Sequence, residues 1–306
     1  MKKKVQLVLG SGGARGIAHI GVIQLLLQDG YEIVEVAGCS MGAVIGGMYC
    51  AGFLPQYTEW LLKQTRSDVY RLFDITFSMQ GFVKGERIFG VLEQLAGKQQ
   101  IEGLSIPFTA IATDMLTRTE VHFNQGDLYK ALRASTGIPG VFTPIAENKS
   151  LFVDGGVLNP LPVDVLKRRD DAIIVAVNLN GAFSNEAIAE KEPEVHDAHQ
   201  TENESQAILT KLRNYFNAAN KSEAKAPAPT PLPSLSMFEM LNASYDATLD
   251  RLTEVNLQRS PVDILVEIPR NVCSVFEFYR AAELINIGKT AYTNAMVKGG
   301  LKELTI

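Results

Sequence analysis

The chain has few of the residues that support metal, redox or disulfide chemistry. Of its 306 residues, three are cysteine and four are histidine. Cys39, Cys50 and Cys273 show no metal-ligand spacing, and three cysteines cannot form a disulfide framework. We therefore expect no metal, no cofactor and a reducing, cytoplasmic setting.

Basic segments and uninterrupted apolar segments are also scarce. Acidic residues outnumber basic ones by 34 to 29, and no basic tract follows the lysines at 2–4, so nucleic-acid binding is not expected. The apolar run near the N-terminus reaches Gly10 after only five residues, which is too short for an export signal. The uncharged stretch 36–58 is long enough to span a membrane, but five glycines interrupt it. We interpret it as a buried strand, turn and helix.

Short apolar runs alternate with helical patterns along most of the chain. Residues 5–9 and 33–37 are predicted to be buried strands, and residues 14–28 a helix, which together make one βαβ unit. Further strands are predicted at 106–112, 172–177 and 262–266, and a closing helix at 284–297. The pattern predicts a single α/β domain over residues 1–306, with a mostly parallel central sheet between helical layers.

The composition changes after Asn180. Residues 184–205 contain seven acidic residues and one lysine, and residues 225–236 contain four prolines. Both compositions are typical of flexible, solvated chain, so we interpret about 181–240 as an insertion. Apolar residues within it recur at helical spacing and predict an amphipathic helix around 208–216. That helix could pack on the rest of the chain, dock on a protein partner or contact a membrane surface.

A serine lies between two glycines where a predicted strand meets a predicted helix. The sequence is Gly38-Cys39-Ser40-Met41-Gly42. In this context Gly-x-Ser-x-Gly is typical of a nucleophile elbow, a strained turn that exposes the hydroxyl beside free N–H groups at the helix start. Ser40 is therefore a candidate nucleophile, and Gly38 and Gly42 are expected to permit the turn. An incidental serine in a glycine-rich turn is the alternative.

A second glycine-rich loop, Gly10-Ser11-Gly12-Gly13-Ala14-Arg15-Gly16, follows the first predicted strand. Its N–H groups are expected to bind an anion, either the pyrophosphate of a nucleotide or an oxyanion. Glu32 and Glu35 stand at about the spacing of a ribose-binding acid. The absence of a Walker Gly-Lys-Ser/Thr ending, and the elbow on the next strand, favour the oxyanion.

A serine nucleophile needs a base, which is usually histidine. The four histidines are His19, His122, His196 and His199, and none is well placed in the predicted elements. A carboxylate is the remaining candidate. Asp154 ends a short apolar strand and is followed by Gly155 and Gly156, although an ordinary turn would have the same sequence.

Together these motifs resemble the patatin-like phospholipase family, in particular its single-domain bacterial cytosolic members. The resemblance covers residues 5–167, including segments 81–85, 112–114, 134–140 and 154–162, and resumes at 281–288. It implies that Ser40 is the nucleophile and Asp154 its partner in a Ser–Asp dyad. It also implies an oxyanion hole made by Gly12, Gly13, Ala14, Arg15 and Gly16.

The implied activity is hydrolysis of acyl esters of phospholipids, lysophospholipids or simpler lipids, without a cofactor. We expect a cytoplasmic protein that contacts the inner face of the membrane peripherally. The apolar stretch 72–83 could line an acyl channel, form a mobile cover or pack in the core. The alternative function is a regulatory or scaffold protein that keeps the acyl-hydrolase fold without turnover.

Overall fold

The computed structural model describes residues 3–78, 81–183 and 237–299. Its described residues form an eight-stranded sheet in the order β10-β9-β1-β2-β5-β8-β7, with β6 also paired to β5. The strands are β1 (Lys3–Leu9), β2 (Tyr31–Cys39), β5 (Phe108–Asp114), β6 (Thr119–Phe123), β7 (Ile145–Glu147), β8 (Ser150–Asp154), β9 (Ala172–Gly181) and β10 (Ile264–Pro269). The strands from β10 to β5 are parallel, whereas β6, β7 and β8 join by antiparallel pairing.

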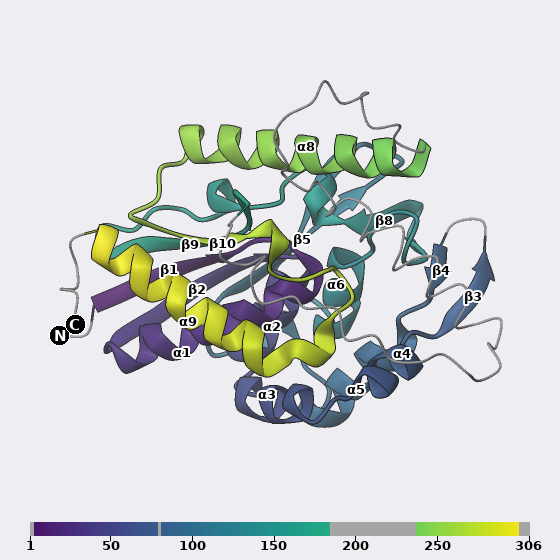
Figure 1. Ribbon diagram of the computed structural model, residues 1–306, viewed down its shortest axis with the longest axis horizontal. Helices are drawn as coiled ribbons and strands as arrows, with labels where there is room; N and C mark the ends of the chain where they lie inside the picture. The colour runs from purple at the N-terminus through teal and green to yellow at the C-terminus, as the bar shows by residue number, and fades with distance from the viewer. Residues whose placement is uncertain (1–2, 79–80, 184–236, 300–306) are drawn as a thin grey trace, which may run out of the picture.

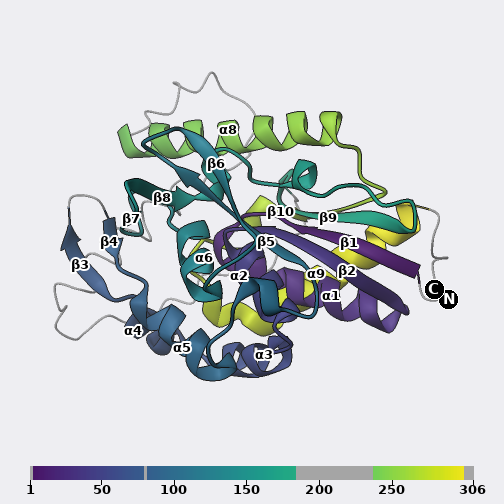
Figure 2. The ribbon, with the colours of Figure 1, turned by 180° about the vertical axis from the view of Figure 1, so that it is seen from behind.

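Helices lie on both faces of this sheet (Figures 1 and 2). One face carries α1 (Ala18–Gln28), α2 (Met41–Cys50) and α9 (Ala281–Lys298), and the other carries α8 (Met237–Arg259). The remaining α-helices are α3 (Leu54–Leu62), α4 (Arg66–Leu72), α5 (Glu86–Ala96) and α6 (Leu128–Ser135), and the strands β3 (Ile75–Ser78) and β4 (Gly81–Val83) form a separate hairpin. The three-layer α/β/α fold predicted from the sequence is confirmed.

The first βαβ unit is also confirmed, because β1 and β2 pair in parallel across α1. The helix predicted from residue 14 begins as a 3₁₀ turn, η1 (Gly13–Ile17), before α1. Strand β5 starts two residues later than predicted, directly after Pro107, which has no N–H to give to the sheet. The uncharged stretch 36–58 is the end of β2, then α2 and the start of α3.

Both ends of the stretch interpreted as an insertion, about 181–240, overlap described elements. Gly181 is the last residue of β9, and α8 already begins at Met237. The helix predicted around 208–216 lies outside the described residues. Sequence reasoning missed α8, whose inward face mixes the buried Leu249 with the equally buried but polar Thr253. Among the described helices, none combines the length and the apolar composition needed to cross a membrane.

Strand β5 brings two distant parts of the chain to one point. On the first half of β5, Cys39 of β2 lies opposite Ile111. The next residue, Ala112, pairs with Asp154 of β8. Because β6 pairs with residues 110–114 and overlaps both partners, it must occupy the opposite edge of β5. Strands β2 and β8 therefore run toward each other along one shared edge, and their ends meet.

The turn after β2 leaves no room for a side chain at Gly42. A Cβ atom there would overlap the carbonyl oxygen of Leu9 and lie 2.7 Å from that of Gly10. We predict that Gly42→Ala lowers the free energy of unfolding by about 1 to 3 kcal/mol, the usual cost of overpacking. Chemical denaturation measures this change. Gly90→Ala is the matched control, because a Cβ there meets nothing within 4 Å in helix α5; wild-type stability of Gly42→Ala would contradict the prediction.

Candidate active site

Ser40 and Asp154, which the sequence singled out separately, are hydrogen-bonded in the structure. The Ser40 hydroxyl donates to Oδ2 of Asp154 at 2.6 Å. Both residues are buried, with 3% and 2% of their surface exposed. The bond follows from the shared edge of β5, since Ser40 comes directly after β2 and Asp154 ends β8.

The backbone at Ser40, where the sequence predicted a nucleophile elbow, is strained. Its φ of 56° and ψ of −126° lie in a region that residues other than glycine rarely adopt. Helix α6 supports this turn, because the Ser40 N–H donates to Oγ of Ser135 at 2.9 Å. The Ser135 hydroxyl in turn donates to the carbonyl of Ile111 at 2.6 Å. Sequence reasoning gave Ser135 no role, and its place in segment 134–140 was the only signal.

The environment of Asp154 makes its carboxyl group more basic than usual. Burial raises its pKa to about 6, although hydrogen bonds from Ser40, from the Gly156 N–H at 2.8 Å and from Cys39 act in the opposite direction. Asp114, at the end of β5, shows the contrast. Desolvation alone would raise its pKa, but hydrogen bonds to its charged form, including those from the N–H groups of Leu151 and Leu116, lower it to about 2.

The glycine-rich loop presents two backbone donors beside Ser40. The Ser11 N–H donates to Pro160 and the Ala14 N–H to Val275, so both are occupied. Within the described part of the chain, the N–H groups of Gly12 and Gly13 have no hydrogen-bond partner. These two glycines line the same polar cavity as Ser40 and Asp154.

Arg15 and Gly16, at the end of the glycine-rich loop, make contacts that fix the position of the loop. The guanidinium of Arg15 is buried and donates to the carbonyl of Arg270 at 3.0 Å and to Oδ1 of Asn180 at 3.2 Å. Gly16 lies against Met41, where a Cβ atom would overlap the methionine side chain. Arg15 and Gly16 therefore hold the loop against the sheet and the elbow helix.

The histidines of the described residues lie away from Ser40, as the sequence indicated. Nε2 of His19 lies 2.9 Å from the carbonyl oxygen of Gly10, and burial lowers the pKa of His19 to about 4. His122 lies in β6 and contacts Glu120. Neither lines the cavities that reach Ser40. His196 and His199 fall outside the described residues.

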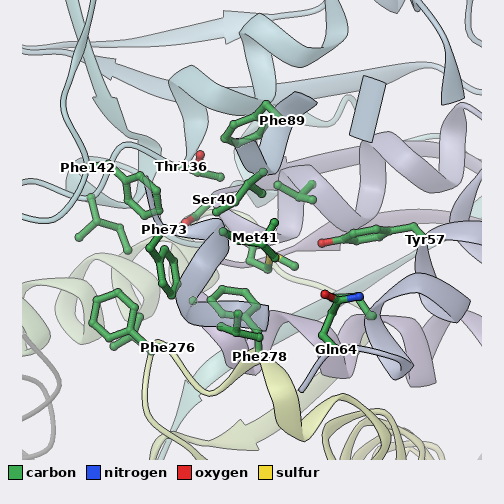
Figure 3. A pocket seen from close by; sticks show the side chains of 18 of the residues that line it. Ser40, Met41, Tyr57, Gln64, Phe73, Phe89, Thr136, Phe142, Phe276 and Phe278 are labelled. Atoms are coloured by element: carbon green, nitrogen blue, oxygen red, sulfur yellow. The ribbon is translucent and has the colours of Figure 1, made fainter. Parts of the chain in front are cut away.

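Two cavities of different chemistry meet at Ser40. An apolar cavity runs between α2, α3 and α5, and its walls are mostly aliphatic and aromatic. Figure 3 shows Ser40 among the rings of Phe73 and Phe142, with Tyr57 farther along. A second, polar cavity is lined by Arg15, Arg270 and Asp246 as well as Asp154. Ser40 and Gly13 line both cavities.

Three roles were open to the apolar stretch 72–83 from its sequence: lining an acyl channel, forming a mobile cover or packing in the core. Different residues of the stretch take different roles. Leu72 and Phe73 line the apolar cavity. Val83 is fully buried and packs with Phe73, Val141 and Phe276, which is core packing. The side chains of residues 75–82 are outside those described, so the mobile cover stays a prediction.

Comparison with known proteins agrees with a lipid acyl hydrolase of this fold. The family model of patatin-like phospholipase matches residues 7–167. An uncharacterized NTE family protein of Mycobacterium tuberculosis is 36% identical over 332 aligned residues, which cover 96% of this chain and 91% of the relative. The chain therefore belongs to the patatin-like phospholipase family, as its motifs predicted.

Two named relatives match a shorter part of the chain. Neuropathy target esterase sws of Drosophila melanogaster is 31% identical over 57% of this chain and 13% of its own length. Lysophospholipase NTE1 of Cryptococcus neoformans is 32% identical over 58% of this chain and 11% of its own length. Among solved structures, VipD of Legionella pneumophila aligns with a TM-score of 0.46 and 13% identity, over 97% of this chain and 67% of that chain.

The raised pKa of Asp154 predicts that this residue destabilises the fold at neutral pH. Below about pH 4 the carboxyl group is protonated in both folded and unfolded chains; above about pH 6 it must be buried as a charge. Asp154→Asn should therefore raise the free energy of unfolding by about 1 to 3 kcal/mol at pH 8, and by much less at pH 4. Denaturation at both pH values measures this difference.

Asp114→Asn is the matched control with the opposite sign. The pKa of Asp114 is lowered, so its carboxylate stabilises the fold above the ordinary pKa, and the variant should lose stability at pH 8. Loss of stability in both variants would show that the burial of Asp154 is not costly.

Proposed function

We propose that this protein is a serine acyl-ester hydrolase of the lysophospholipase or esterase type, in which Ser40 and Asp154 form a catalytic dyad. The observation that carries the proposal is the 2.6 Å hydrogen bond between these two buried side chains, at the point where an apolar and a polar cavity meet. The names of the Drosophila and Cryptococcus relatives, an esterase and a lysophospholipase, support the same chemistry.

In the proposed reaction Asp154 accepts the Ser40 proton while Ser40 Oγ attacks the acyl carbon. The N–H groups of Gly12 and Gly13 donate to the oxyanion that forms. The carbon–oxygen bond to the alcohol then breaks, Asp154 returns its proton to the alcohol oxygen, and an acyl-Ser40 intermediate remains. Water hydrolyses this intermediate in a second step that uses the same base.

The weak basicity of an aspartate limits how well such a dyad can remove the serine proton. A free aspartate, with a pKa of about 3.9, is a weak base near neutrality. Burial of Asp154 brings its pKa to about 6, nearer the working range, without a histidine. The support for this mechanism is therefore electrostatic as well as geometric.

The two cavities suggest how a lipid would lie. The apolar cavity offers an acyl chain a lining of aliphatic and aromatic side chains, whereas the polar cavity offers ion pairs and hydroxyl groups to the alcohol portion. The substrate class is therefore an acyl ester with a polar alcohol, as in a lysophospholipid. A peripheral encounter with a membrane on its cytoplasmic side is part of this proposal, because the substrate is a lipid.

Substitution of the dyad distinguishes an enzyme from a scaffold that retains the fold. We expect Ser40→Ala and Asp154→Asn each to lower kcat/KM for a p-nitrophenyl ester and for lysophosphatidylcholine by at least about a hundredfold. A fluorophosphonate probe should label the wild type and not Ser40→Ala. Asp171→Asn is the control, an exposed aspartate paired with Lys4, and should keep wild-type activity.

The pH dependence of the wild type provides a second readout of the dyad. Because protonated Asp154 cannot accept the Ser40 proton, kcat/KM should fall about tenfold for each pH unit below about 6. Full activity in either folded dyad variant would overturn the proposal, and lack of any Ser40-dependent turnover would favour the scaffold.

We predict that one residue of the apolar cavity, Val44, controls the length of the acyl chain that the protein accepts. Val44 is buried one turn after Ser40 in α2 and lines the apolar cavity. Val44→Phe should lower kcat/KM for a dodecanoyl ester at least about tenfold relative to a butanoyl ester, because the added ring takes space that a long chain needs. Val44→Ile should give a smaller effect in the same direction. An unchanged ratio in both variants, at wild-type thermal stability, would place the acyl chain elsewhere.

A further inference from the structure

The polar cavity contains a hydroxyl group that the dyad mechanism leaves without a role. Tyr245 on α8 lines this cavity together with Ser40, Asp154, Gly12 and Gly13. Tyr245 is partly buried. Tyr245 therefore brings a polar side chain to the cavity that Ser40 and Asp154 also line.

Helix α8 is anchored just after Tyr245 by ion pairs to Arg270, a residue that also contacts the glycine-rich loop. Asp246 and Asp250 both pair with Arg270, the first at 3.6 Å. The carbonyl of Arg270 accepts a hydrogen bond from Arg15 of the glycine-rich loop. Leu249, one turn after Tyr245, is buried. The position of Tyr245 is thus tied to the loop that carries the Gly12 and Gly13 donors.

The surroundings keep the phenol protonated. Burial raises the pKa of Tyr245 well above its usual value, and the nearby negative charge of Asp154 raises it further. A phenol that stays neutral is a hydrogen-bond donor at working pH and does not act as a base.

The reacting carbon has four substituents, and the structure accounts for three of them. One is Ser40 Oγ, the second is the acyl chain in the apolar cavity, and the third is the oxyanion at Gly12 and Gly13. The fourth, the alcohol oxygen, is left with the polar cavity that Tyr245 lines.

We propose that Tyr245 is a further catalytic residue, which donates a hydrogen bond to the alcohol oxygen as it leaves. The inference rests on the proposed function. When the acyl carbon–oxygen bond breaks, the electron pair goes to that oxygen and the proton comes from Asp154, which returns to its carboxylate form. Tyr245 stabilises the developing negative charge and remains protonated throughout.

Leaving-group chemistry tests this role. An alkyl alcohol is a poor leaving group, so its departure needs the hydrogen bond from Tyr245. p-Nitrophenolate is a good leaving group and departs readily without that bond. We expect Tyr245→Phe to lower kcat/KM for monooctanoyl glycerol about tenfold or more, and to change kcat/KM for p-nitrophenyl octanoate less than about twofold. The ratio of kcat/KM values reports the first bond-breaking step, because both esters form the same acyl-enzyme.

Two further measurements separate this role from a structural one. Tyr245→Phe should react with a fluorophosphonate at the wild-type rate, because fluoride also leaves readily and the dyad is intact. Tyr57→Phe, a tyrosine in the apolar cavity, should change kcat/KM for both esters by the same factor. An equal loss on both esters in Tyr245→Phe, or no loss on either, would overturn the inference. Absence of Ser40-dependent turnover in the wild type would overturn the proposed function, and the inference with it.

Discussion

The closeness of Ser40 and Asp154 depends on the way two strands, β2 and β8, share one edge of β5. β2 and β8 approach from opposite directions along β5 and end at consecutive pairing positions. Two residues that are 114 positions apart in the chain thereby come within 2.6 Å of each other. Backbone hydrogen bonds set their separation, and Ser135 reinforces the same point by joining the Ser40 N–H to the backbone of β5.

The same arrangement explains the chemical difference between two carboxylates at strand ends. The carboxylate of Asp114 accepts hydrogen bonds from backbone N–H groups, and these lower its pKa. Such bonds suit a residue that holds a turn in place. Asp154 is buried, accepts fewer hydrogen bonds and has a raised pKa, which makes its carboxylate more basic. Burial of such a group opposes folding, and we infer that the well-packed parallel half of the sheet offsets that cost.

Local patterns in the sequence predicted the βαβ unit, the elbow at Ser40 and the candidacy of Asp154, because strand ends and glycine turns have strong short-range signals. The family model confirms the family that these motifs indicated. The roles assigned to Ser135 and Tyr245 could not be predicted, since each depends on contacts between distant segments. Helix α8 escaped prediction because polar residues such as Thr253 interrupt its buried face. The helix expected around 208–216 remains a prediction.

Most of the residues that line the apolar cavity come from a different part of the fold than Ser40 and Asp154 do. Most of its lining belongs to α3, α4, α5 and the segment before α9, whereas Ser40 and Asp154 stand on the sheet. Insertions, deletions or exchanges in those peripheral helices can therefore reshape the cavity while Ser40 and Asp154 keep their spacing. Evolution within such a scaffold can diversify selectivity separately from reactivity.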